Sequence, residues 1–189
     1  AYLAQLMINF YETTGEINYL DDAKKIVQQT WDLFYDKENK ILQKNPIKQN
    51  DLFVPPLDIN DSNIPNGNSV FLLNCKKLEA ITNNTKWQGM AKELIQSFHS
   101  FLNLKSTQMT SYIKNLDMCE ELTTFTFFGD IKKIKELQQF VKKNYLKSST
   151  LIYKEDPKEN YLVVCKNQTC SNKIKSIEEL KSVVKNYAI

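Results

Sequence analysis

A helical hairpin pattern occurs twice in this chain of 189 residues, and the two copies are offset by 68 residues. The first copy covers residues 1–34 and the second covers residues 69–102, and in each a helix ends at a Thr-Gly or Thr-Asn turn before a second helix begins. At this offset the matched pairs are Phe10 with Leu78, Thr14 with Thr82, Tyr19 with Trp87, Ala23 with Ala91, Lys24 with Lys92 and Ile26 with Leu94. One such hairpin cannot bury its own apolar face, so the repeat predicts hairpins that stack into a solenoid or a closed toroid.

The helical pattern extends, with one interruption, to about residue 120. The first helix is predicted to end near Thr14, and the second to carry Asp21 or Asp22 in its first turn, where a carboxylate suits the helix dipole. The buried stripe of the second helix is predicted to comprise Ala23, Ile26, Val27, Thr30, Trp31 and Phe34. Further helices are predicted from about Ser69, from about Thr85 and over residues 107–119. Residues 36–67 show no helical pattern and contain Pro46, Pro55, Pro56 and Pro65, which predicts a long loop of the kind that often carries function.

The pattern changes after Glu121 from helical to mixed. Residues 122–128 form a β-branched and aromatic run that predicts a strand, and Asp130 is predicted to cap the helix that follows. Two further strands are predicted over residues 149–154 and 161–165, before a last helix over residues 176–187 that Ser176 and Glu179 open as a capping box. The sequence therefore predicts a mainly α fold in two parts: residues 1–120 as the helical hairpins of an incomplete α/α toroid, and residues 121–189 as a small mixed α/β subdomain with the order β-α-β-β-α.

Charge is distributed unevenly between these two parts. Residues 1–120 hold 12 lysines and 14 acidic residues, whereas residues 121–189 hold 13 lysines and 8 acidic residues. All 25 basic residues are lysines, although arginine is the preferred residue for bidentate contacts to phosphate and guanine. We therefore expect no nucleic-acid partner. The chain contains no run of about 18 apolar residues, so we also expect no membrane partner and a cytoplasmic location.

The segment DSNIPNGNS, residues 61–69, is the most unusual local sequence, because it places a carboxylate, amides, a glycine and a hydroxyl directly before a helix. Gly67 permits a backbone conformation that is closed to other residues, and Asn68 or Ser69 could cap the helix. Free N–H groups at such a helix start can receive an anionic or polyhydroxyl ligand. The simpler interpretation is an elaborate N-cap with an Asx turn. The alternative is a ligand cavity lined by Asp61, Pro65, Gly67, Asn68 and Ser69, with Asp61 near its mouth.

Other residues with chemical potential form no catalytic constellation in the sequence. Cys165 and Cys170 are separated by four residues, which matches neither a C-x-x-C redox motif nor a zinc knuckle, so we expect no metal there and leave a disulfide open. Cys75 and Cys119 are predicted to act as small buried hydrophobic residues. His99 is the only histidine, and a surface or packing role is predicted for it. The carboxylates that could form an acid/base pair are Glu12, Asp58, Asp61, Asp117 and Glu120, and their spacing singles out no pair. Catalytic residues therefore stay unassigned, and no cofactor is expected.

Three segments of the chain are distinctive when taken together: IPNGNSVFLLNCKKLEAITNNTKW over residues 64–87, FFGD over residues 127–130, and VVCKNQTCSNKIKSIEELKSVV over residues 163–184. In this order they resemble segments of the spermatogenesis-associated thioredoxin-domain-containing proteins. The resemblance implies a thioredoxin-like domain followed by an α/α toroid similar to N-acylglucosamine 2-epimerases and six-hairpin glycosidases. This chain would then be the C-terminal part of such a protein, and the missing N-terminal part would be its partner. Pro65, Gly67, Asn68 and Ser69 match the family's pattern and carry over as candidate cavity-lining residues, whereas Asn66 stands where the family has serine.

Three functions remain open for the chain. The first is the C-terminal part of a thioredoxin-domain-containing protein with a cavity for a small sugar-like ligand. The second is a sugar epimerase or glycosidase-like enzyme, which needs carboxylates or a histidine that converge on Asn68. The third is a noncatalytic helical protein-interaction module, which needs an exposed apolar patch. Since two and a half hairpins cannot close a six-hairpin toroid, we expect the inner faces of the first and third helices to be partly exposed or covered by another chain, and the chain to be capable of self-association.

Overall fold

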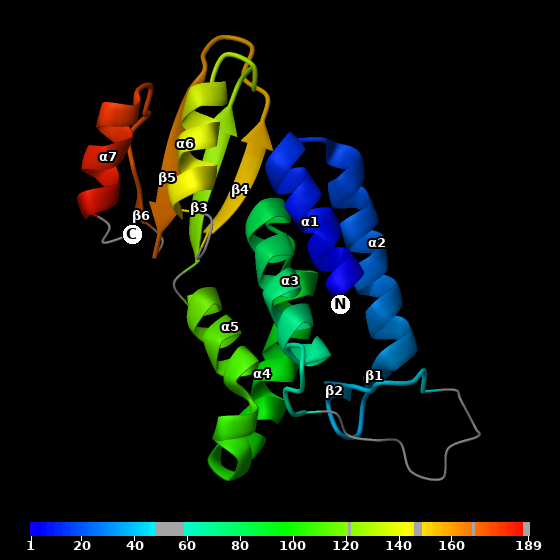
Figure 1. The fold of residues 1–189 in the computed structure, drawn as a ribbon. Coiled ribbons are helices and arrows are strands. Elements are labelled where there is room, and N and C mark those ends of the chain that lie inside the picture. The colour runs from blue at the N-terminus through cyan, green and yellow to red at the C-terminus, as the bar shows by residue number, and fades with distance from the viewer. Residues whose placement is uncertain (48–58, 121, 146–148, 168, 187–189) are drawn as a thin grey trace. The chain divides into compact units, whose positions relative to one another are not determined.

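A computed structural model describes residues 1–47, 59–120, 122–145, 149–167 and 169–186, and it confirms that the fold is mainly α (Figure 1). The chain divides into two compact units. The first unit comprises Ala1–Tyr11 and Glu16–Cys119, and the second comprises Glu12–Gly15 and Glu120–Ile189. The predicted segment of residues 48–58, with Pro55, Pro56 and Asp58, lies outside the described residues.

The first unit is built from helices and one small hairpin of strands. Its elements are α1 (Tyr2–Thr14), whose last three residues belong to the second unit, α2 (Ile17–Phe34), β1 (Tyr35–Asp36), β2 (Ile41–Leu42), α3 (Gly67–Thr82), α4 (Thr85–Lys105), the short 3-10 helix η1 (Ser106–Gln108) and α5 (Thr110–Glu120), whose last residue belongs to the second unit. Helix α3 is the central element, since its side chains are buried almost continuously from Asn68 to Leu78. An aromatic contact joins α2 to it, since Trp31 of α2 stacks on Phe71 of α3 with ring centroids 5.9 Å apart.

The predicted hairpin repeat is confirmed at the level of helix boundaries. Helices α1 and α3 end at Thr14 and Thr82, which are matched by the 68-residue offset, and α2 and α4 also start at matched positions. The residue after each first helix has a left-handed backbone, with φ of 78° at Gly15 and 53° at Asn83. Glycine and asparagine are the residues that adopt this conformation most readily, so the two turns use the same geometry with different side chains. Both hairpins therefore reverse the chain in the same way.

One predicted feature of the second helix is wrong. Helix α2 begins at Ile17, directly after the Gly15 turn, so Asp21 and Asp22 lie beyond its first turn. These carboxylates instead pair with lysines three residues later, Asp21 with Lys24 at 2.5 Å and Asp22 with Lys25 at 3.6 Å. Of the predicted buried stripe, Ala23 and Val27 are buried, and the other members are half-buried.

The exposure of the first and third helices differs, against the prediction that both would be partly open. Helix α1 exposes an apolar stripe at helical spacing, with Leu3 56 %, Leu6 45 % and Phe10 40 % exposed. The residues of α3 at the matched positions are Phe71, Asn74 and Leu78, and all are 0 % exposed. An apolar face is therefore partly exposed on α1, whereas the matched residues of α3 are buried and α2, α4 and β2 contact that helix.

The second unit is a mixed four-stranded sheet with two helices. Its elements are β3 (Thr123–Phe128), α6 (Lys135–Tyr145), β4 (Ser149–Lys154), β5 (Tyr161–Lys166), β6 (Thr169–Cys170) and α7 (Ile177–Asn186), and the strand order is β4-β3-β5-β6. Strands β3 and β4 are parallel and joined through α6, whereas β5 pairs antiparallel with β3 and β6 pairs antiparallel with β5. The predicted order β-α-β-β-α is present, with β6 as an addition too short to be predicted.

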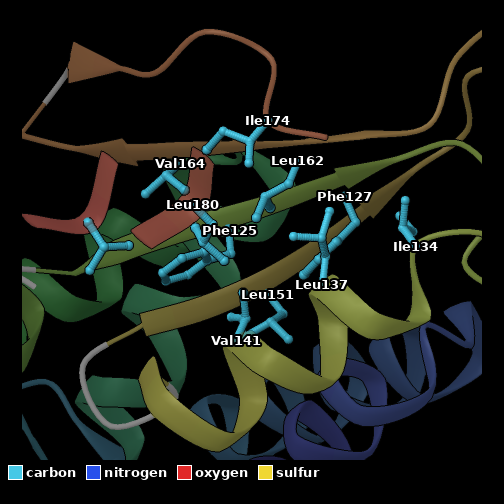
Figure 2. Close-up of a cluster of buried hydrophobic side chains, with 11 residues drawn as sticks. Phe125, Phe127, Ile134, Leu137, Val141, Leu151, Leu162, Val164, Ile174 and Leu180 are labelled. Carbon is cyan, nitrogen blue, oxygen red and sulfur yellow. The ribbon is translucent and has the colours of Figure 1, made fainter. Parts of the chain in front are cut away.

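One face of this sheet forms a core with both helices, as Figure 2 shows. Phe125 pairs in register with Leu151 on one side and with Val164 on the other, and Phe127 pairs with Leu162. Because side chains alternate between the faces of a strand, these five residues point the same way. Side chains from α6 and α7 cover them: Leu137, Val141, Leu180 and Val184.

The starts of the two helices in this unit differ from the prediction in detail. Helix α6 begins at Lys135, not directly after Asp130. The Asp130 side chain instead accepts a hydrogen bond from the backbone N–H of Lys132 at 2.9 Å, which closes a separate turn. At α7 the Ser176 hydroxyl accepts from the Glu179 N–H at 3.2 Å, as predicted. The Glu179 carboxylate accepts from the N–H of Lys175 at 2.7 Å, so the capping box closes one residue earlier than predicted.

Candidate functional site

The start of α3 is capped by Asn66, and the prediction that Asn68 or Ser69 caps this helix is wrong. The helix begins at Gly67, so Asn66 occupies the N-cap, and its side-chain oxygen accepts from the N–H of Asn68 at 2.8 Å. Ser69 is fully buried and donates its hydroxyl hydrogen bond back to the Asn66 carbonyl at 2.7 Å. Gly67 does not have a positive φ, so the conformational freedom predicted for it is not used.

Asn68 has a structural partner in the strand hairpin. Its Oδ1 accepts from the backbone N–H of Leu42 at 2.7 Å, and its Nδ2 donates to the Leu42 carbonyl at 2.9 Å. A primary amide that makes both bonds imitates the backbone of a neighbouring strand. Since Asn68 is only 4 % exposed, these bonds satisfy a polar group that would be costly to leave unpaired. Asn68 therefore fixes β2 against the start of α3.

Asp61 holds the start of a different helix. Its carboxylate accepts from the backbone N–H of Ser111 at 2.7 Å, the Ser111 hydroxyl, the Thr110 hydroxyl at 3.1 Å and the backbone N–H of Asn66 at 2.8 Å. Burial raises the pKa of Asp61, but the hydrogen bonds from Ser111, Asn66 and Thr110 outweigh burial and hold its pKa below its ordinary value. Asp61 is thus an ionised cap that joins α5 to the segment before α3.

A cavity of about 350 Å³ lies beside these residues within the first unit. It is lined by Ala1, Tyr2, Thr30, Phe34, Leu42, Gln43, Lys44, Asn60, Ser62, Ile64, Pro65, Asn66, Gly67 and Asn68. Of the five predicted site residues, Pro65, Gly67 and Asn68 line the cavity, whereas Asp61 and Ser69 do not. Part of the predicted segment therefore lines the cavity, while Asp61 and Ser69 hold that segment in place through their hydrogen bonds with Asn66.

Two lining residues that the sequence did not single out are prominent. The Oδ1 atom of Asn60 is buried and has no hydrogen-bond partner within the described part of the chain. Tyr2 donates its hydroxyl hydrogen bond to the Pro65 carbonyl. Asn60 directly precedes the predicted segment, and its place in the Asn-Asp-Ser-Asn run of residues 60–63 is the sequence feature that could have marked it as a site residue. No local signal marks Tyr2, because its partner is 63 residues away.

The residues considered for acid/base catalysis do not meet at this cavity. His99 is exposed on α4, and Asp117 and Glu120 are exposed on α5. Glu12 is buried in the second unit, where its carboxylate accepts from the Thr150 hydroxyl at 2.6 Å. Asp58 lies outside the described residues. Among the described lining residues there is neither a carboxylate nor a histidine.

The four cysteines fall into two classes. Cys165 and Cys170 face each other across β5 and β6 and form a disulfide with a Cα–Cα distance of 4.1 Å, which answers the question that the sequence left open. Cys75 and Cys119 are buried and form no disulfide with each other, as expected of small buried hydrophobic residues. Burial raises the pKa of the Cys75 thiol well above its ordinary value, which makes it unreactive. Across the described residues, no group of three or more His, Cys, Asp or Glu side chains could hold a metal ion.

No known protein family matches the chain, and no curated protein matches it. Within the described ranges, no helix combines the length and the apolar content that crossing a membrane requires.

Proposed function

We propose that the cavity at the start of α3 binds a small, neutral, polyhydroxyl ligand of the sugar class. The observation that carries this proposal is the buried Oδ1 of Asn60, which has no partner in the described part of the chain and lies among the cavity-lining residues. A buried acceptor left unpaired costs about 1–3 kcal/mol. Because this oxygen is buried, a ligand hydroxyl would donate to it after the Asn60 side chain turns toward the cavity, and that hydrogen bond would remove the cost.

The composition of the lining favours a neutral ligand over a charged one. Lys44 is the one charged side chain among the described lining residues, and the other polar side chains carry amides or hydroxyls, as in Gln43, Asn60 and Ser62. Amides offer both donors and acceptors, which is what a polyol presents in return. Phe34 and Tyr2 supply aromatic surface, and a volume of about 350 Å³ falls in the usual range for small-ligand cavities.

The geometry supports binding more than it supports the alternative of a sugar epimerase or glycosidase-like enzyme. An acid/base mechanism of glycoside hydrolysis uses two carboxyl groups on opposite sides of the reacting bond. Two carboxylates contact lining residues, and both are already occupied: Asp61 accepts from Ser111 and Asn66, and Asp36 accepts from Gln43 at 2.6 Å. No catalytic residue is assigned in this proposal.

We further propose that the chain is part of a larger assembly of helical hairpins, as its resemblance to the thioredoxin-domain-containing family implies. Support comes from the exposed stripe of Leu3, Leu6 and Phe10 on α1, whose counterparts on α3 are all buried. Another hairpin, from the N-terminal part of the same protein or from a second copy, would cover this stripe. The third alternative, a protein-interaction module, draws on the same observation. A cytoplasmic location remains a proposal, and the disulfide weakens it, because disulfides are rare in that compartment.

The test of the ligand proposal is a thermal-shift and calorimetric screen of neutral monosaccharides and disaccharides on the whole chain. We expect a saturable rise in Tm with at least one sugar. Asn60→Ala should weaken the binding of that sugar about tenfold, the equivalent of one hydrogen bond. Asn63→Ala is the matched control, since Asn63 is exposed and does not line the cavity. Equal affinities for wild type and Asn60→Ala, or no shift with any sugar, would contradict the proposal.

A further inference from the structure

The disulfide between Cys165 and Cys170 lies at one edge of the sheet in the second unit (Figure 1). Strand β6 ends the strand order, and both of its residues, Thr169 and Cys170, are exposed, whereas Cys165 of β5 is half-buried. The neighbouring Val164 belongs to the core between the sheet and its helices, so Cys165 points to the opposite face of the sheet. Reagents in solution therefore reach this bond most easily from the side of Cys170.

Hydrogen bonds beside the disulfide hold the same two segments together without it. The Ser171 N–H donates to the Val164 carbonyl at 2.8 Å, and the Ser171 hydroxyl accepts from the Val164 N–H at 3.1 Å. Further along, Leu162 and Ile174 exchange both of their backbone hydrogen bonds at 2.9 Å. Ile174 is also only 2 % exposed and packs in the core of this unit. The segment of residues 171–174 therefore has its own anchors on β5, which remain when the sulfur–sulfur bond opens.

Strand pairing also keeps the two cysteines opposite each other. Cys165 and Cys170 are partners in the register of β5 and β6, and their Cα atoms are 4.1 Å apart. Directly opposed residues of antiparallel strands lie about 4.5 Å apart in a non-hydrogen-bonded pair, so the register brings the sulfur atoms within bonding reach. The bond joins residues only five positions apart, and a short closed loop gains less stability from its disulfide than a long one. The fold of this unit therefore depends little on the bond, and the reduced pair stays placed to form it again.

We propose that Cys165 and Cys170 form a thiol–disulfide exchange site that opens and closes, with a low-molecular-weight thiol as reductant, while the second unit stays folded. The thiolate of the reductant attacks Sγ of the exposed Cys170 and forms a mixed disulfide with it. The bond between the two cysteines breaks, and its electron pair leaves on Sγ of Cys165, which takes a proton from water. A second thiolate attacks the sulfur of the bound reductant, which leaves as the oxidised disulfide and releases Cys170 as a thiolate. Two electrons thus pass from two thiols to the cysteine pair, and the oxidised reagent reverses both steps.

The test equilibrates the whole chain with mixtures of reduced and oxidised glutathione in the absence of denaturant. Free thiols are then blocked with a maleimide and located by peptide mass spectrometry, while circular dichroism follows the fold. We expect Cys165 and Cys170 to become blocked together as reduced glutathione is raised, and to be protected again when oxidised glutathione is restored. The buried Cys75 and Cys119 are the internal control and should stay unblocked throughout. A pair that stays oxidised in excess reduced glutathione until urea is added would overturn the proposal, and so would unfolding on reduction.

The order of the steps is tested on wild type and on two matched single variants. Wild type exposed briefly to reduced glutathione in the presence of the maleimide should carry glutathione on Cys170 and the maleimide on Cys165. With oxidised glutathione, Cys165→Ser should form its mixed disulfide at Cys170 about tenfold faster than Cys170→Ser forms one at Cys165, because access governs the rate of exchange. Equal rates in the two variants would overturn the assignment of Cys170 as the attacked sulfur. Glutathione found on Cys165 in wild type would overturn it without any variant.

Discussion

Removing the Asp61 carboxylate is the sharpest test of how the first unit is held together. Asp61→Ala leaves the N–H groups of Ser111 and Asn66 without this acceptor, along with the hydroxyl of Thr110. A hydrogen bond to a charged group contributes about 1.5–3 kcal/mol, and loss of a helix cap costs about 1 kcal/mol. Since Asp61 is partly exposed, water replaces some of these bonds, and the Asn66 N–H retains a 3.2 Å bond to the Ser111 hydroxyl. We therefore expect the free energy of unfolding to fall by about 2–3 kcal/mol.

Urea denaturation followed by circular dichroism measures this loss. The matched control is Asp117→Ala on the same helix α5, where Asp117 is exposed, and its effect should stay within about 0.5 kcal/mol. The pH dependence gives a second readout. The folded-state pKa of Asp61 is lowered, so its contribution is present above the unfolded pKa of about 3.9 and is lost as the pH falls through the folded value. The difference between wild type and Asp61→Asn should therefore shrink below about pH 4. A loss from Asp61→Ala no larger than that of Asp117→Ala would refute the capping role.

Three further predictions concern the stability of the fold, and each is measured as the free energy of unfolding in urea. Asn68→Asp should cost about 2–3 kcal/mol, because a carboxylate oxygen would face the Leu42 carbonyl to which the amide now donates. An unchanged stability would exclude the hydrogen bond between Asn68 and Leu42. Gly129→Ala should cost at least about 2 kcal/mol, because φ is 92° at this residue and the new Cβ would lie 2.4 Å from the side-chain oxygen of Asn160. Gly89→Ala in α4 should instead stabilise the protein by about 1 kcal/mol, because no atom lies within 4 Å of the new Cβ. Equal effects of the two glycine changes would contradict this. Replacing Cys165 and Cys170 by serine should cost about 2 kcal/mol, as expected for a short closed loop, and a variant as stable as wild type would show that the bond does not stabilise the fold.

The elements that the sequence predicted well are those whose signal is local and periodic. The turn after each first helix was marked by Thr-Gly or Thr-Asn, and both turns have left-handed backbones at Gly15 and Asn83. The strand β4 was predicted with its observed bounds, because its run of apolar and β-branched residues is closed on both sides by polar ones. Elements of two residues, such as β1, β2 and β6, are too short to carry a periodic signal.

The contacts of the candidate segment differ from those that the sequence predicted. The segment of residues 61–69 does adjoin a cavity, but the role given to Asn68 belongs to Asn66, and Asp61 caps α5 in place of facing a ligand. These roles could not be predicted because the hydrogen bonds that define them join residues far apart in the sequence. Asn68 bonds to a residue 26 positions away, and Asp61 bonds to one 50 positions away. Local sequence shows that a polar side chain stands at a helix start, but only the packed fold decides which backbone group it meets.

These assignments also decide how binding and stability can be separated in this segment. Substitutions at Asp61 or Asn68 remove hydrogen bonds that hold α5 and β2, so any loss of ligand affinity would be mixed with a loss of structure. Asn60 differs, because its Oδ1 makes no bond in the described part of the chain. Removing an acceptor that is buried and unpaired relieves a cost in the free protein. Asn60→Ala should therefore leave stability unchanged or raise it slightly while it weakens sugar binding. If stability and affinity fell together in this variant, Asn60 would be a structural residue, and the cavity would lose its main support as a ligand site.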